Sequence, residues 1–142
     1  ADDDAAVAAA LRVTDTLELA DRNVDELSGG QRQRLSIAAA LVHSPKVFFM
    51  DEPTTGLHPA DVELLMAQLH RLVDAGNTVI VVEHKMDVVA SADWVIDLGP
   101  AGGDGGGEVM AVGTPDVVAR SKESRTAPYL AAACRWDTEP AS

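Results

Sequence analysis

Residues 47–54 read VFFMDEPT, an apolar run followed by two acids and a proline. A short continuous apolar run between turn residues predicts a strand buried on both faces, as in a parallel sheet. Asp51 and Glu52 then fall at the carboxyl end of that strand, where α/β sheets bind their ligands. The stretch therefore predicts an α/β fold with a site at this edge of the sheet.

The next residues extend this prediction to a strand–helix–strand unit. Residues 59–75 place apolar side chains at helical spacing, with Pro59 suited to the first turn and Gly76 to the stop. Residues 79–82 form a second apolar run. A helix of this length between two buried strands predicts a right-handed crossover and parallel pairing.

The flanking segments predict further elements. Towards the amino terminus we expect a helix over residues 2–22 and another from Ser28 to about His43. Beyond residue 84 we expect a helix over 85–91, strands over 94–98 and 108–112 paired antiparallel at an edge, a glycine-rich loop over 99–107, and a helix capped by Thr114. The predicted organisation is a helical lead-in (1–26), a main domain (27–130) and a disordered tail (131–142).

Composition excludes several classes of protein. The 142 residues carry 11 Lys+Arg against 23 Asp+Glu, a net charge of −12, which excludes a basic nucleic-acid-binding module but not a segment of a larger DNA-associated protein. The single cysteine, Cys134, excludes a disulfide framework and a cysteine-based zinc cluster. The apolar runs are too short for a membrane span and no signal peptide opens the chain, so a cytoplasmic setting is expected.

Residues 27–31 read LSGGQ and form the first candidate binding motif. Ser28 can cap the following helix, and Gln31, three residues later, can complete a capping box. Gly29 and Gly30 leave the first amide N–H groups uncovered, and such a helix start can bind phosphate. Taken alone, the motif is more simply interpreted as an ordinary capped helix.

The acids after the first strand and a histidine after the second form the other candidate site. Neighbouring side chains on a strand point opposite ways, so Asp51 can hold a hydrated Mg²⁺ while Glu52 orients and deprotonates an attacking water. His84 follows the strand at 79–82 and could hydrogen-bond a terminal phosphate. Taken alone, the two acids are unremarkable as solvated residues at the start of a turn, and a lone histidine is more often polar surface.

The order of these motifs resembles that of the ATP-binding-cassette (ABC) ATPases. The resemblance implies the C-terminal portion of a P-loop NTPase domain, with parallel core strands and an antiparallel edge but without the phosphate-loop half. It further implies a signature motif at 27–31, a Walker B strand ending in a catalytic Glu52, a Mg²⁺ site at Asp51 and a switch histidine at His84.

Family members close two sites between two cassettes. Carried over, this implies that Ser28, Gly29, Gly30 and Gln31 bind the ATP of a partner cassette. The partner is either upstream in the same chain or a second copy. His58 would lie at the interface between the cassettes.

A closer resemblance covers about residues 27–130. The stretches at 51–58, 76–84, 92–100, 102–107, 113–115 and 126–130 are similar to the C-terminal cassette of the UvrA family of excinuclease proteins. This implies coupling of ATP binding and hydrolysis to DNA damage recognition in nucleotide excision repair. The implied cofactors are ATP and Mg²⁺, with no zinc in this segment, and the implied partners are DNA and other excision-repair proteins.

Two departures keep alternatives open. Residues 31–34 read QRQR, which is closer to transporter cassettes than the Glu-Ala-Gln-Arg usual in the UvrA family, and suggests a drug-resistance paralogue. The sequence also contains no Gly-x4-Gly-Lys-Ser/Thr phosphate loop and begins with Ala1, so we expect a piece of a longer ATPase that is inactive in isolation. The alternatives are the nucleotide-binding domain of a drug-export transporter and an inactive fragment; residues 55–58 and 99–107 argue against the transporter.

Overall fold

The computed structural model describes residues 2–100 and 107–136, which fall into two compact units, residues 1–82 and 83–142. The boundary lies inside the main domain expected at 27–130. In chain order, the first unit contains α1 (Asp2–Val13), the short 3-10 helices η1 (Leu17–Leu19) and η2 (Val24–Glu26), α2 (Gly29–Leu41), β1 (Val47–Asp51), α3 (Pro59–Asp74) and β2 (Thr78–Val82).

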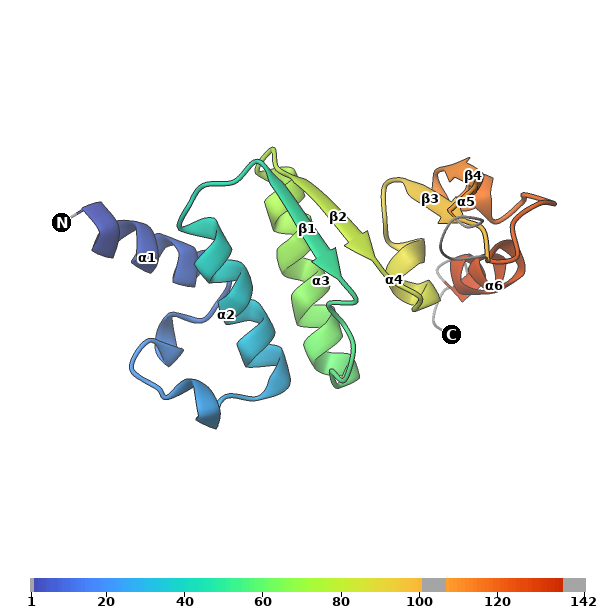
Figure 1. Cartoon of the computed structure of the whole chain (residues 1–142). Helices are drawn as coiled ribbons and strands as arrows, with labels where there is room; N and C mark the ends of the chain where they lie inside the picture. Colours follow the sequence, from blue (N-terminus) through green and yellow to red (C-terminus); the bar gives the residue numbers. More distant parts are fainter. Residues whose placement is uncertain (1, 101–106, 137–142) are drawn as a thin grey trace. The chain divides into compact units, whose positions relative to one another are not determined.

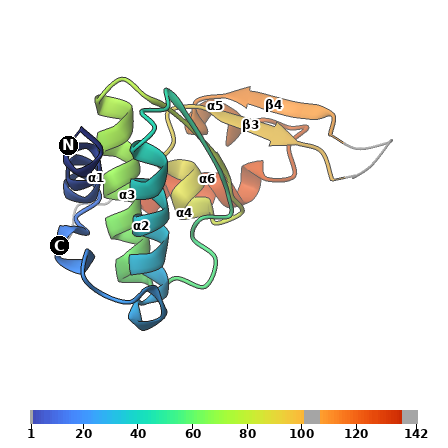
Figure 2. The same cartoon turned by 60° about the vertical axis from the view of Figure 1, so that its left-hand side comes forward.

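The first unit is built on the parallel pairing of β1 with β2, as the sequence predicts (Figure 1). The register runs from Val47 opposite Thr78 to Asp51 opposite Val82. Helix α3 makes the connection between the two strands, and α2 lies beside α3 in both views (Figure 2). The predicted strand–helix–strand unit is therefore confirmed.

The core of this unit lies between the sheet and the two helices. Phe48 points from β1 into a cluster with Ile37 of α2 and Leu65, Leu69 and Leu72 of α3, each at most 5% exposed. Because side chains alternate across a strand, the next residues along β1 and β2 point to the opposite face.

That opposite face is bare, so the prediction of strands buried on both faces is wrong for this chain. The side chains of Val47, Phe49, Ile80 and Val82 are 56%, 67%, 46% and 46% exposed. The physical reason is that α2 and α3 cover a single face, and no described element of the first unit covers the other one.

The helix expected over residues 2–22 ends at Val13. Thr14 and Thr16 are fully buried, and their hydroxyl oxygens lie 2.7 Å apart. The chain turns through Asp15, whose φ is +49°, and the N–H of Thr16 donates to the carbonyl of Leu11 at 2.8 Å. Gln68 of α3 donates to the carbonyl of Thr14, so a contact across 54 residues of sequence fixes the helix end.

The second unit contains α4 (Met86–Ala90), β3 (Val95–Leu98), β4 (Val109–Gly113), α5 (Pro115–Val118) and α6 (Ala127–Trp136). Strands β3 and β4 pair antiparallel, as predicted, with a register shift at Asp97 and Leu98. Val95, Val118 and Leu130 form its core.

Two expectations for this unit need correction. Thr114 is the residue before α5, but its side chain makes no capping hydrogen bond. The tail expected from residue 131 is helical up to Trp136, because α6 continues there. Residues 137–142, and residues 101–106 of the expected glycine-rich loop, lie outside the described residues.

No helix among the described residues has the length and apolar character needed to cross a membrane.

The bare sheet face gives a first prediction about the isolated chain. Exchanging Phe49 for Ser should reduce self-association in analytical ultracentrifugation and leave the circular dichroism spectrum unchanged, because an exposed apolar side chain is removed. Phe48→Ser is the matched control. Phe48 is 5% exposed, and emptying a core position of this size costs about 3–5 kcal/mol, so the control should unfold the chain. Equal behaviour of the two variants would contradict the assignment of the faces.

Candidate functional site

The two acids of the candidate site lie where β1 ends. Asp51 is the last residue of the strand, opposite Val82, the last residue of β2. The N–H of Glu52 donates to the carbonyl of Val82 at 2.8 Å, which continues the ladder one step beyond the strand. Both acids are exposed. The predicted position of the acids at the carboxyl end of the parallel strands is therefore confirmed.

Glu52 has a left-handed backbone, with φ of +44°. Residues other than glycine rarely adopt this region, and the cost is about 1–2 kcal/mol. Such conformations persist where the surrounding structure enforces them, often at functional sites. Nothing in the sequence pattern indicates this feature.

The turn after Glu52 holds both its backbone and its carboxylate. The N–H of Thr55 donates to the carbonyl of Glu52 at 3.1 Å, and the Thr55 hydroxyl donates to Oε2 of Glu52 at 3.2 Å. Thr54 is fully buried beneath the turn, and Gly56 turns the chain at a φ of +73°. The Glu52 carboxylate is thus oriented by its own loop.

His58 caps α3. Its Nδ1 accepts a hydrogen bond from the N–H of Ala60 at 3.3 Å, so the cap uses one of the two ring nitrogens. This capping role was missed in the sequence. The expected place of His58 at an interface between cassettes stays a prediction.

The predicted capping box at the start of α2 is confirmed. Ser28 Oγ accepts from the N–H of Gln31 at 3.2 Å, and the N–H of Ser28 donates to Oε1 of Gln31 at 2.9 Å. Ser28 and Gly29 are exposed, whereas Gly30 is buried. The box fixes the first turn of α2 and leaves its tip facing solvent.

The glycines of the motif at 27–31 lie against the segment that follows the acids. A Cβ placed on Gly29 would lie 3.4 Å from Cδ2 of Leu57. A Cβ placed on Gly30 would lie 2.5 Å from Cγ and 2.8 Å from Cβ of Asp61, closer than real side chains approach. Leu57 and Asp61 therefore link the two motifs, and neither residue was singled out from the sequence.

His84 lies two residues beyond β2 and belongs to the second unit. Its N–H donates to Oε2 of the preceding Glu83 at 3.2 Å. Since Asp51 and Glu52 belong to the first unit, the expected convergence of His84 with the two acids stays a prediction.

The residues at the end of β1 fit a Mg²⁺ ion bound chiefly through water and phosphate oxygens. Mg²⁺ keeps several waters and takes one or two protein carboxylates beside its substrate phosphates. The exposed carboxylate of Asp51 meets this requirement. No group of three or more His, Cys, Asp or Glu residues that could enclose an ion occurs among residues 2–100 and 107–136.

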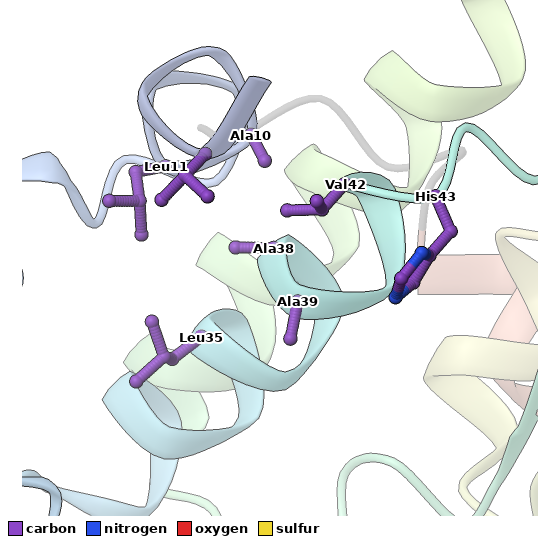
Figure 3. A pocket seen from close by; sticks show the side chains of 8 residues that line it. Ala10, Leu11, Leu35, Ala38, Ala39, Val42 and His43 are labelled. Atoms are coloured by element: carbon purple, nitrogen blue, oxygen red, sulfur yellow. The ribbon is translucent and has the colours of Figure 1, made fainter. Parts of the chain in front are cut away.

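An open apolar pocket lies between α1 and α2, away from the candidate site. Figure 3 shows Ala10 and Leu11 of α1 facing Ala38 and Val42 of α2. Its lining consists of Val7, Ala10, Leu11, Leu35, Ala38, Ala39, Val42 and His43. The lining offers no carboxylate or hydroxyl, so this pocket carries none of the predicted chemistry.

The capping box predicts a stability effect in the 142-residue chain. Ser28→Ala removes the acceptor of the Gln31 N–H and should lower the free energy of unfolding of the first unit by about 1 kcal/mol. Urea titration followed by circular dichroism measures this change. Ser28→Thr, which keeps a hydroxyl acceptor, is the control and should retain most of the stability; equal losses in both variants would contradict the capping role.

The sequence model of the ABC transporter family matches residues 2–55. Over 107 residues, or 73% of this chain, the sequence is 57% identical to the UvrABC system protein A of Lactiplantibacillus plantarum and 52% identical to that of Pasteurella multocida. The chain spans about 11% of the length of these relatives.

Solved structures similar to this chain include a UvrA protein and an ABC transporter cassette. UvrA2 from Deinococcus radiodurans is 53% identical, with a TM-score of 0.73, over 91% of this chain and 16% of the other. CbiO1 from Clostridium perfringens, part of the ABC transporter complex cbiONQ, is 35% identical, with a TM-score of 0.70, over 84% of this chain and 46% of the other. The chain is therefore a C-terminal segment of an ABC-type ATPase cassette, similar to the UvrABC system protein A family over most of its length.

Proposed function

We propose that this chain supplies two half-sites of a UvrA-like ATPase. In one, Asp51 and Glu52 act on ATP that the phosphate-loop part of the same cassette holds. In the other, residues 28–31 bind the ATP of a partner cassette. The observation that carries the proposal is the backbone of Glu52, held in a left-handed conformation at the end of β1 with its carboxylate oriented by Thr55.

Glu52 is the general base of the proposed reaction. An exposed carboxylate at the carboxyl end of a parallel strand can accept the proton of a water that attacks a terminal phosphate. The Thr55 hydroxyl donates to Oε2, and this bond sets the direction in which the carboxylate faces. Asp51 would hold a Mg²⁺ ion through water, and that ion neutralises charge on the phosphates when bound.

The start of α2 is suited to phosphate. Ser28 Oγ uses a lone pair to accept the N–H of Gln31, which leaves the hydroxyl proton able to donate to a phosphate oxygen. Gly29 is exposed, and its N–H and the positive end of the helix suit the same ligand. Capping and phosphate binding at Ser28 are thus compatible.

His84 and His58 complete the proposed assignment. His84 would contact the terminal phosphate of the ATP attacked through Glu52. His58 would lie between the cassettes, where Nε2 can reach a partner because the α3 cap uses only Nδ1.

The wider role that we propose is DNA damage recognition in nucleotide excision repair, in the cytoplasm, with DNA, other excision-repair proteins and a second cassette as partners. The names of the relatives support this role. A net charge of −12 indicates that DNA is bound by other parts of the protein. Drug resistance, suggested by residues 31–34, gains no support from these relatives, and the likeness to cbiO1 supports only the shared cassette.

The test of this proposal is Glu52→Gln in the full-length protein. Hydrolysis of ATP should fall at least about 100-fold, because the general base is lost, while ATP binding is retained. Steady-state phosphate release and equilibrium ATP binding measure the two effects. The control, Glu63→Gln, neutralises an exposed acid on α3 and should hydrolyse ATP normally. Unchanged turnover in Glu52→Gln would show that another group activates the water.

The Thr55 hydrogen bond gives a separate prediction for the same enzyme. Thr55→Val removes the donor to Oε2 of Glu52, and kcat should fall by about tenfold, as expected for losing a hydrogen bond to a charged group. The KM for ATP should stay constant, because the bond orients the base rather than the nucleotide. Thr55→Ser should restore kcat; a Val variant with wild-type kcat would contradict the orienting role.

A further inference from the structure

The first turns of α2 and α3 touch at one point. Asp61 is the third residue of α3, and Gly30 is the second residue of α2. A Cβ on Gly30 would lie 2.5 Å from Cγ and 2.6 Å from Oδ1 of Asp61. The Asp61 carboxyl group therefore fills the space beside Gly30, and the two helix starts are as close as a glycine allows.

This contact places a negative charge beside the amino terminus of α2. The end of a helix carries about half a positive charge there, and an acid nearby is stabilised by it. Asp61 lies in the first turn of its own helix and also against the first turn of α2. In the described part of the chain, no lysine, arginine or histidine forms an ion pair with Asp61.

A phosphate bound at the start of α2 would be attracted by the positive helix end and repelled by the carboxylate of Asp61. The terminal phosphate of ATP is an anion that uses the N–H groups and the dipole of this helix end. A carboxylate beside Gly30 offsets part of that attraction, and its influence is strongest within a turn of the helix end. The charge of Asp61 thus opposes phosphate binding at residues 28–31.

We propose that the negative charge of Asp61 lowers the affinity of the signature turn, residues 28–31, for the phosphate of the partner's ATP. It thereby raises the ATP concentration at which the two cassettes close and favours their reopening after hydrolysis. This inference rests on the proposed function and adds a control on affinity to it.

The charge and the shape of Asp61 can be separated by substitution. Asparagine keeps the volume that fills the space beside Gly30 and removes the charge. A purely packing role for Asp61 therefore leaves the KM for ATP unchanged in Asp61→Asn. If Asp61 acts through its charge, Asp61→Asn has a lower KM for ATP than the wild type. This decrease is smaller at high salt, because ions screen the interaction.

The experiment measures kcat and KM for ATP in the full-length protein at about 0.1 M and 1 M salt. Asp61→Asn should lower KM by about two- to fivefold at low salt, the range expected for one charge at a helix end, with a smaller change at high salt. Asp61→Ser, a second neutral variant, should shift KM in the same direction. Glu63→Gln removes an equal charge from the exposed side of α3 and should change KM less than about twofold.

The inference is overturned if both neutral Asp61 variants have a KM for ATP equal to or above that of Glu63→Gln. It is also overturned if their KM decreases by the same factor at low and at high salt. Failure of the proposed function is a different result. It appears as full turnover in Glu52→Gln, whatever the KM of the Asp61 variants.

Discussion

The parallel pairing of β1 with β2 is the constraint on which the rest of the first unit depends. Its last rung, from the N–H of Glu52 to the carbonyl of Val82, is 2.8 Å long. This bond ties the left-handed Glu52 to the neighbouring strand and so fixes where the turn 52–56 begins. The turn leads directly into α3, whose first residues contact the start of α2. One hydrogen-bonded edge thus positions both motifs of the candidate site.

The same arrangement brings the start of α2 and the pair of acids together in one small unit. The glycine at 30 is required by its packing against Asp61, whereas a Cβ on Gly29 would lie at ordinary contact distance from Leu57. Without a Cβ at Gly30, α2 and α3 approach closely and form one core through Ile37, Leu65 and Phe48.

Local patterns predicted most of the fold. Residues 59–75 were recognisable as a helix because their apolar spacing follows the 3.6-residue period. The two strands were recognisable as short apolar runs, and the box at Ser28 and Gln31 as a local motif. The position of the two acids at the carboxyl end of β1 followed from the strand assignment alone.

Features set by distant contacts were not predictable from local patterns. The first helix ends at Val13 because Gln68 and a buried pair of threonines stabilise the turn that follows it. The contact between Asp61 and Gly30 depends on how α2 and α3 pack. The φ of Glu52 is imposed by the turn and by Val82, and the exposure of Phe49 depends on which elements are present to cover it.

The most direct measurement is a crystal structure of the full-length Glu52→Gln variant with Mg²⁺ and ATP. Residue 52 should keep its left-handed backbone, with its side chain within hydrogen-bond distance of a water in line with the terminal phosphate. Ser28 Oγ should contact the phosphate held by the partner cassette. A structure in which residue 52 points away from the nucleotide, or in which another carboxylate holds that water, would contradict the assignment of Glu52 as the general base.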